Sequence, residues 1–147
     1  TDEQVLAAFV KDAPELEKEL HQAFENIAGM VTPRAYAIPW LQELKAKGYH
    51  VYYLSNFSHK AETECAEALN FLPEMEGGIL SYKEHLIKPE PEIYRTLLDK
   101  FNLVADECVF LDDRRENIEA AETQGIHTVL FTTYQDALEK LKTYGVM

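Results

Sequence analysis

The sequence has few of the residues that mark several large classes of protein. Among its 147 residues there are two cysteines, Cys65 and Cys108, with no Cys-x-x-Cys or Cys/His spacing. This excludes a zinc site or a disulfide framework, and reduced cysteines favour the cytoplasm. No apolar run approaches the roughly 20 residues that a membrane-spanning helix needs, so we expect no membrane partner.

Basic residues are also scarce. Fourteen Lys and Arg stand against 26 Asp and Glu, which gives a formal net charge of −12. A negative field of this size opposes binding to nucleic acid and to anionic membrane surfaces, so we expect no nucleic-acid partner. A phosphorylated ligand therefore requires positive charge that is placed locally.

The remaining composition is that of an ordinary folded domain. Hydrophobic residues make up 46% of the chain and charged residues 27%, which is enough apolar material for one core and argues against disorder. The first residue is Thr1 and not Met, which favours a coding start upstream.

Hydrophobic periodicity divides the chain into a helical first part and an alternating second part. Apolar residues recur at three- and four-residue steps through residues 2–29, with an interruption at Pro14, which predicts two helices. From residue 49 onward, strand and helix patterns alternate four times, which is typical of an α/β fold with a Rossmann-like, doubly wound parallel sheet. Strands are predicted to end at Ser55 and to cover 78–82, 108–111 and 127–131; helices are predicted over 35–47, 58–70 and 134–144, after Pro89 and Pro91, and after Asp113.

Two adjacent carboxylates, Asp112 and Asp113, follow the apolar strand pattern 108–111 directly. Ligands bind at the carboxyl ends of strands in open α/β sheets, and paired carboxylates there favour a hard cation such as Mg²⁺. We expect Asp113 to bind the metal directly and Asp112 to bind it or orient its waters, with Asn117 hydrogen-bonded to an aspartate or a neighbouring loop. The alternative is that one aspartate caps the helix and the other is solvated.

Two further loops follow strand patterns and carry polar residues. Ser55 and Asn56 are placed to hold a phosphate oxygen where a helix begins, although either could simply cap that helix. Lys88 precedes Pro89, which biases its backbone to an extended conformation, and its side chain could neutralise a phosphate and an attacking carboxylate together. A solvated surface lysine is the alternative. Right-handed crossovers predict that all three loops meet at one edge of the sheet.

The order of these motifs resembles the haloacid dehalogenase-like hydrolase superfamily. The resemblance lies in LSNFS (54–58), KPEPEIY (88–94) and FLDDRRENIEAAETQGI (110–126). It is closest to the branch with a helical cap, which includes the amino-terminal phosphatase domain of soluble epoxide hydrolase. It implies that residues 1–32 are the remainder of the cap and that 33–147 form the α/β core.

The resemblance also implies a function, a Mg²⁺-dependent phosphatase that acts on small phosphate monoesters through an aspartyl-phosphate. Ser55 and Asn56 would hold the phosphoryl group, Lys88 would steady nucleophile and phosphate, and Asp113 with Asp112 would hold Mg²⁺. These are the catalytic, substrate-binding and metal-binding residues that we expect.

One family motif is absent from the sequence. No Asp-x-Asp follows an apolar strand pattern, so residues 1–147 contain no recognisable nucleophile. In the family the strand that carries it lies between the strands that end here at Ser55 and at Asp112. We therefore expect the chain to be the carboxy-terminal portion of a phosphatase and to be inactive when isolated. The partners expected are a complementing amino-terminal segment or a second copy in a homodimer.

Three alternative functions remain. A 2-haloacid dehalogenase shares the fold but uses no metal, which leaves the adjacent carboxylates unexplained. A catalytically inactive binding protein would account for the missing nucleophile, but not for the presence of Ser55, Lys88 and Asp113 together. A phosphoacceptor signalling domain would carry its acidic pair early in the chain, and here the pair comes last.

Overall fold

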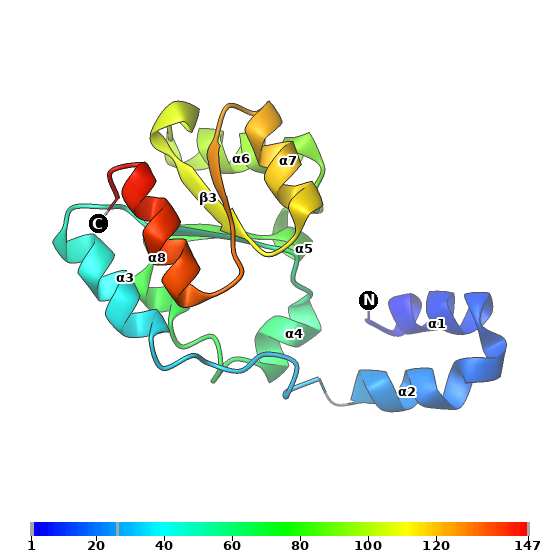
Figure 1. Ribbon diagram of the computed structural model, residues 1–147. Helices are drawn as coiled ribbons and strands as arrows, with labels where there is room; N and C mark the ends of the chain where they lie inside the picture. The colour runs from blue at the N-terminus through cyan, green and yellow to red at the C-terminus, as the bar shows by residue number, and fades with distance from the viewer. Residues whose placement is uncertain (1, 26, 147) are drawn as a thin grey trace.

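The computed structural model describes residues 2–25 and 27–146, which form an α/β body and a projecting helical hairpin (Figure 1). The hairpin consists of α1 (Asp2–Asp12), the short 3₁₀ helix η1 (Pro14–Leu16) and α2 (Glu17–Glu25). Pro14 occupies the first turn of η1, where its missing N–H costs nothing, and it separates the two predicted helices. Residue 26, within the predicted helical stretch, lies outside the described residues.

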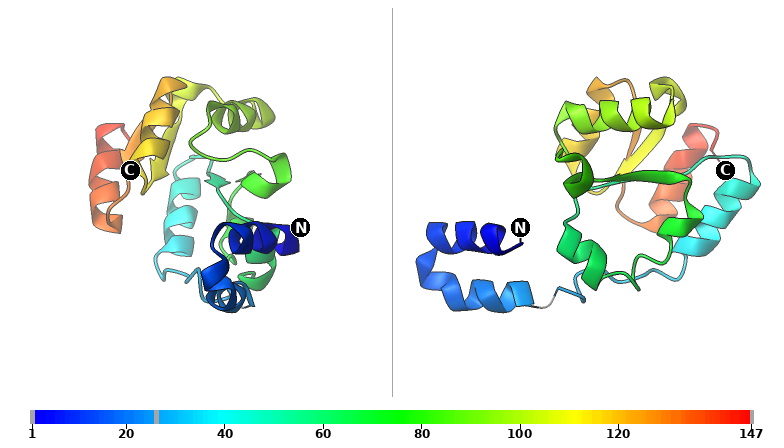
Figure 2. Two further views of the ribbon diagram at one scale, coloured as in Figure 1. Left: turned by 90° about the vertical axis from the view of Figure 1, so that its right-hand side faces the viewer. Right: turned by 180° about the vertical axis from the view of Figure 1, so that it is seen from behind.

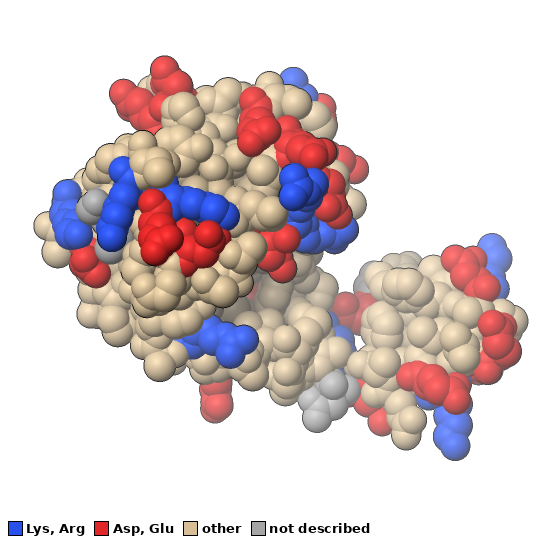
Figure 3. All heavy atoms as spheres, in the orientation of Figure 1, with Lys and Arg blue, Asp and Glu red and all other residues tan. Residues whose placement is uncertain are grey.

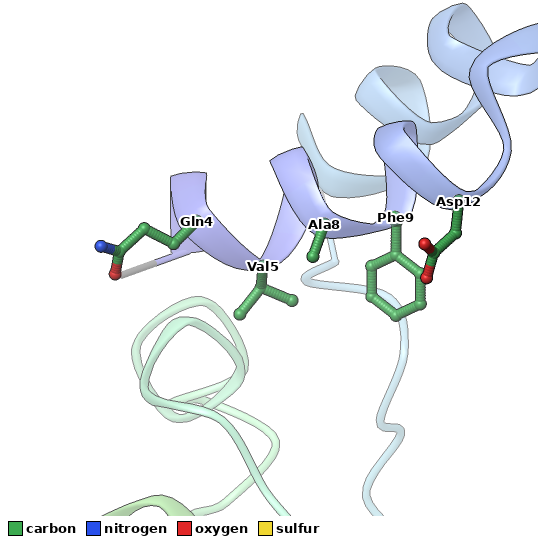
Figure 4. Close-up of a pocket in the computed structure, with 5 residues that line it drawn as sticks. All are labelled: Gln4, Val5, Ala8, Phe9 and Asp12. Atoms are coloured by element: carbon green, nitrogen blue, oxygen red, sulfur yellow. The ribbon is translucent and has the colours of Figure 1, made fainter.

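Neither hairpin helix has a buried residue. Val5 and Phe9 of α1 remain 49% and 50% exposed, and Figure 4 shows their side chains and that of Ala8 on one side of the helix. Together with Gln4 and Asp12 they line a shallow hollow. The hairpin stands apart from the body in Figure 1 and in the right-hand view of Figure 2. The division into a cap remainder over residues 1–32 and an α/β core over 33–147 stays a prediction.

Four short parallel strands form the centre of the body. They are β1 (Tyr52–Ser55), β2 (Gly77–Leu80), β3 (Val109–Asp112) and β4 (His127–Leu130). The α/β fold class with parallel strands is confirmed. The strands form two separate pairs, however, with β1 beside β2 and β3 beside β4. Parallel strands are usually covered on both faces, yet β1 has no buried residue and β3 has only Asp112.

Helices follow the strands as the alternation predicts. They are α3 (Ala37–Ala46), α4 (His59–Glu64), α5 (Ser81–Glu84), α6 (Pro91–Phe101), α7 (Arg115–Thr123) and α8 (Tyr134–Thr143), with the 3₁₀ helices η2 (Leu72–Glu74) and η3 (Ala105–Glu107). Local chemistry sets several ends. Pro91 opens α6, Asn102 ends it in a left-handed conformation, and Thr133 caps α8 by accepting a hydrogen bond from Asp136 N.

Two predicted elements were wrong in extent. The helix predicted over 58–70 ends at Glu64, and residues 65–71 continue as turns because Cys65 leaves the helical conformation. The strand predicted over 78–82 ends at Leu80, because Ser81 starts α5. The Ser81 hydroxyl accepts a hydrogen bond from Phe57 N (3.0 Å) and donates one to Phe57 O (3.2 Å), which joins the loops after β1 and β2.

A cluster of buried apolar residues lies where β2, α6 and α7 meet, and it contains Ile79, Ile93, Tyr94, Leu97, Ala121 and Ile126. On the face shown in Figure 3, acidic and basic side chains are interspersed over the body. In the part of the chain that the structure describes, no helix is both long enough and apolar enough to cross a bilayer.

Gly78 in β2 is required by the closeness of β1. A Cβ atom at this position would lie 2.1 Å from Tyr53 O and 2.5 Å from the nearest atoms of the Tyr53 ring. The backbone oxygen cannot move without breaking the β1 pairing, so Gly78→Ala is expected to lower the free energy of unfolding by roughly 3 kcal/mol. Urea unfolding measures the change. Gly29→Ala is the control, because no atom lies within 4 Å of its built Cβ; equal losses in the two variants would contradict the prediction.

Candidate active site

Lys88 joins the carboxyl ends of the two strand pairs. Its Nζ donates hydrogen bonds to Leu54 O in β1 (2.8 Å) and to Asp112 Oδ2 at the end of β3 (2.6 Å). The lysine and aspartate side chains are only 9% and 7% exposed. The interpretation of Lys88 as a solvated surface charge was therefore wrong. An ammonium group with two fixed partners and so little solvent contact is held at one point between the strand pairs.

Asn56 fixes the backbone at Lys88. Its side-chain amide donates to Lys88 O (2.8 Å), and its Oδ1 accepts from Lys88 N (2.8 Å). The helix cap that sequence reasoning allowed for Ser55 or Asn56 is supplied instead by Ser58, whose Oγ accepts from Ala61 N (3.1 Å). Ser55 is half-buried as the last residue of β1. The polar loop after β1 is thus tied directly to the loop that carries Lys88.

Both oxygens of the Asp112 carboxylate accept hydrogen bonds. Besides Lys88 on Oδ2, its Oδ1 accepts from Asn117 Nδ2 (2.9 Å) and from Arg114 N (2.9 Å). Burial by itself raises the pKa of the Asp112 carboxyl, but these three donors outweigh burial and hold the pKa below its ordinary value. Asp112 is therefore ionised at neutral pH and orients Lys88. The hydrogen bond predicted for Asn117 is present.

Two aromatic side chains, Phe110 and Tyr94, pack beside these polar groups. The Phe110 ring centroid lies 5.4 Å from Lys88 Nζ, and Tyr94 meets Phe110 edge-on at 5.6 Å. Tyr94 has no exposed surface, and its hydroxyl donates to Asn117 O (2.9 Å). Burial and the negative charge of Asp112 raise the pKa of Tyr94 to about 12. The sequence pattern did not identify either aromatic residue as part of the site. Periodicity shows which apolar positions face the core, but not which ring contacts a polar group.

Removal of the Tyr94 hydroxyl tests this support. Tyr94→Phe keeps the buried ring and loses only the hydrogen bond to Asn117 O, so a loss of about 1 kcal/mol in the free energy of unfolding is expected. Thermal and urea unfolding measure it. Tyr144→Phe is the matched control, because its hydroxyl donates to Thr128 O (3.2 Å) from a residue that is 43% exposed. A loss in the control as large as in Tyr94→Phe would contradict the role of burial.

Asp113 differs from its neighbour, because it is exposed. The guanidinium of Arg114, the next residue, pairs with Glu116, whereas its backbone N–H bonds to Asp112. Within residues 2–25 and 27–146, no three Asp, Glu, His or Cys side chains gather into a metal-binding group. Carboxylate oxygens are the ligand type that Mg²⁺ prefers, so the exposed carboxylate of Asp113 is chemically suited to bind the ion. Both oxygens of Asp112 accept hydrogen bonds from nitrogen donors.

The comparisons with known proteins agree with this geometry. The family model described as haloacid dehalogenase-like hydrolase matches residues 2–125. The chain belongs to the haloacid dehalogenase-like hydrolase family. The resemblance seen in the three sequence motifs is therefore confirmed, and with it the assignment of the chain to a family of hydrolases.

Two curated relatives and one solved structure illustrate the range of this family. A sesquiterpene phosphatase of Aspergillus oryzae is 30% identical over 108 residues, which are 74% of this chain and 55% of that protein. Bifunctional epoxide hydrolase 2 of Mus musculus is 42% identical over 57 residues, 39% of this chain and 10% of that protein. A HAD-family enzyme of Bacteroides thetaiotaomicron, in complex with magnesium and inorganic phosphate, aligns with a TM-score of 0.64 and 27% identity over 71% of this chain and 55% of that one. The chain thus spans less than two thirds of each protein's length.

Proposed function

We propose that this chain is part of a Mg²⁺-dependent phosphatase that hydrolyses small phosphate monoesters through an aspartyl-phosphate. The observation that carries the proposal is the position of Lys88, whose ammonium group lies between Leu54 O and Asp112 Oδ2 at the carboxyl ends of both strand pairs. A buried cation at that point can neutralise a phosphoryl group and an attacking carboxylate together. The magnesium and phosphate bound by the Bacteroides enzyme support the same assignment.

Each polar residue of the site has a role in this proposal. Ser55 and Asn56 hold the phosphoryl oxygens at the end of β1, and Lys88 neutralises them. Asp113 is the exposed carboxylate that holds the metal, and Asp112 with Asn117 orients Lys88 and the start of α7. Bound Mg²⁺ would offset the negative charge that develops on the phosphoryl oxygens. The substrate is therefore a small phosphorylated molecule.

The nucleophile in this proposal is an aspartate outside residues 1–147. Its strand would lie between β1 and β3, which form no hydrogen-bonded pair with each other and are only half-buried. A strand in that place would pair with both of their free edges and cover their apolar side chains. It would be supplied by a complementing amino-terminal segment. A homodimer and a cytoplasmic location, where Cys65 and Cys108 stay free thiols, complete the proposal.

A second candidate is a binding protein of the same fold that has no catalytic activity. The observation in its favour is the sequence itself, which has no Asp-x-Asp after an apolar strand. Such a protein would use Ser55, Asn56 and Lys88 to hold a phosphorylated ligand without cleaving it. A dehalogenase is less favoured, because its metal-free chemistry has no use for the exposed carboxylate of Asp113.

One assay separates these functions. The protein in which residues 1–147 are joined to the strand with the nucleophile is tested on para-nitrophenyl phosphate and on 2-chloropropionate, with Mg²⁺ and with EDTA. The phosphatase proposal predicts phosphate release that needs Mg²⁺ and no chloride release. Chloride release that EDTA does not affect would establish the dehalogenase. Phosphate binding without turnover, measured by isothermal titration calorimetry, would favour the binding protein.

A further inference from the structure

The segment that follows α2 is held at the end of α4, where Ile27 and Ala28 form hydrogen bonds with the side chains of Glu64 and Cys65. Ile27 N donates to Glu64 Oε2 (3.0 Å). The Cys65 thiol lies within hydrogen-bond distance of both Ile27 O (3.3 Å) and Ala28 O (3.7 Å). Residues 27 and 28 belong to no helix or strand, and Ile27 O also accepts a hydrogen bond from Met30 N (2.9 Å). The bonds to Glu64 and Cys65 are those that tie this segment to the end of α4.

The side chains that make these bonds are themselves fixed. Glu64 pairs through Oε1 with Lys60 one turn earlier on α4, and the two side chains are 20% and 27% exposed for lysine and glutamate respectively. Cys65 is 2% exposed. Glu64 cannot turn into solvent without losing its ion pair with Lys60, and the Cys65 side chain is enclosed by the protein. Ile27 and Ala28 are therefore attached to a preorganised surface.

Helix α4 also connects this point to the candidate active site. Its cap, Ser58, lies three residues after Ser55 at the end of β1. On another side of the helix, Glu62 accepts hydrogen bonds from the Tyr82 hydroxyl and from Lys83 Nζ (2.8 Å) of α5. The six residues of α4 thus form a short link between the loop after β1, the loop after β2 and the segment at Ile27.

The hairpin needs such an attachment because its own packing is local. Its helices α1 and α2 contact chiefly each other and η1, and neither has a buried residue. Figures 1 and 2 show the hairpin on the same side of the body as α4, joined to it by the segment that follows α2. That is the side of the body at which α4 continues the chain from the carboxyl end of β1.

We propose that Lys60, Glu64 and Cys65 form a hinge clamp that fixes Ile27 and Ala28 on α4 and so sets the position of the α1–α2 hairpin relative to the candidate active site. These three are positioning residues and touch no substrate. The link to catalysis rests on the proposed function, whereas the clamp itself does not. The hinge clamp makes the geometry of the loop at Ser55 and the position of the hairpin depend on one short helix.

Hydrogen–deuterium exchange of the 147-residue chain, read by mass spectrometry, tests the clamp without any substrate. Glu64→Ala removes the acceptor of Ile27 N–H, so exchange of peptides that contain Ile27 is expected to become about 10-fold faster. Glu64→Gln keeps an oxygen at this position and should restore most of the protection. Glu67→Ala, an exposed acidic residue nearby, is the control and should change nothing.

Other outcomes decide the remaining parts of the proposal. Unchanged exchange at Ile27 in Glu64→Ala would overturn the clamp. If Glu64→Ala instead exchanges faster at every amide, the whole fold has been loosened, and Lys60→Met is measured in its place. This variant keeps the Glu64 carboxylate and removes only the lysine that pairs with it. In Lys60→Met, an increase of about threefold in the exchange rate that is confined to Ile27 supports the clamp. If the exchange rate at Ile27 does not change in this variant, the clamp is overturned. Cys65→Ser, which keeps a donor, should protect the segment better than Cys65→Ala.

A kinetic measurement tests the link to catalysis separately. In the active phosphatase, Glu64→Ala is expected to raise KM about threefold or more for a bulky phosphate ester and to leave kcat for para-nitrophenyl phosphate unchanged. An equal change in KM for both substrates would refute the positioning role, and the result of the exchange experiment would still stand. Absence of phosphatase activity in the unmodified protein would refute the proposed function and leave the clamp to the exchange data.

Discussion

Lys88→Met is expected to lower the free energy of unfolding by about 3–5 kcal/mol at neutral pH, because it leaves the buried Asp112 carboxylate without its cation. The methionine keeps the apolar stem over Phe110 and removes only the ammonium group that donates to Leu54 O and Asp112 Oδ2. Urea unfolding followed by circular dichroism measures the loss. A loss below about 1 kcal/mol would show that the pair is not held away from solvent.

Lys140→Met is a matched control for this prediction. Lys140 also donates to an aspartate, Asp136 Oδ2 (2.7 Å), and to a backbone oxygen, Leu130 O (3.1 Å). Its side chain and that of Asp136 are 41% and 35% exposed, against 9% and 7% for Lys88 and Asp112. Water can replace the lost ammonium group there, so a loss of less than about 1 kcal/mol is expected. The difference between the variants isolates the effect of burial.

The pH dependence of the Lys88→Met effect has a definite sign. In the unmodified chain the pKa of Asp112 is lowered, so its stabilisation is present above the unfolded pKa of about 3.9 and is lost as pH falls through the lower folded value. Without Lys88 the pKa of Asp112 rises, because burial is no longer outweighed. The difference in stability between the two proteins should therefore shrink as pH is lowered from 7 to 4.

The double variant Lys88→Met/Asp112→Asn should recover at least half of the loss at pH 7.

Asp113→Asn is expected to reduce Mg²⁺-dependent phosphatase activity about 10³-fold while the free energy of unfolding stays unchanged. Asp113 is exposed, so its replacement by an isosteric amide leaves no buried group unpaired. Loss of the carboxylate weakens the metal site that we propose. Steady-state kinetics over a range of Mg²⁺ concentrations, together with calorimetric titration of Mg²⁺ and urea unfolding, separate the effects on the metal and on the fold.

Two further variants make the Asp113 result specific. Glu119→Gln removes another exposed carboxylate, on α7, and should leave both activity and Mg²⁺ affinity as they are. Asp112→Asn should lower activity and stability together, because that carboxylate holds Lys88, Asn117 and the N–H of Arg114. Full Mg²⁺-dependent activity in Asp113→Asn would show that this aspartate does not hold the metal.

Local sequence patterns predicted most of the elements. Alternating strand and helix patterns placed all four strands and the helices α4, α6 and α7 between them, since side-chain periodicity and capping act within a few residues. The short helix α5 was not predicted. The errors occurred where contacts from elsewhere decide an element's end. Ser81 leaves the strand to bond with the backbone of Phe57, 24 residues earlier. Beyond Glu64, the chain makes turns in a region where the thiol of Cys65 contacts residues 27 and 28.

For the site, the sequence by itself determined which residues are polar at the strand ends and in what order: Ser55 and Asn56, then Lys88, then Asp112 and Asp113. It left the partners of each one open. Only the tertiary structure decided that Asp112 is buried against Lys88 while Asp113 is exposed, that the strands form two pairs, and that Glu64 and Cys65 hold the segment after α2. The physical reason is range: periodicity reports the face on which a residue lies, whereas burial and hydrogen bonding depend on chain segments that are brought together from far apart in sequence.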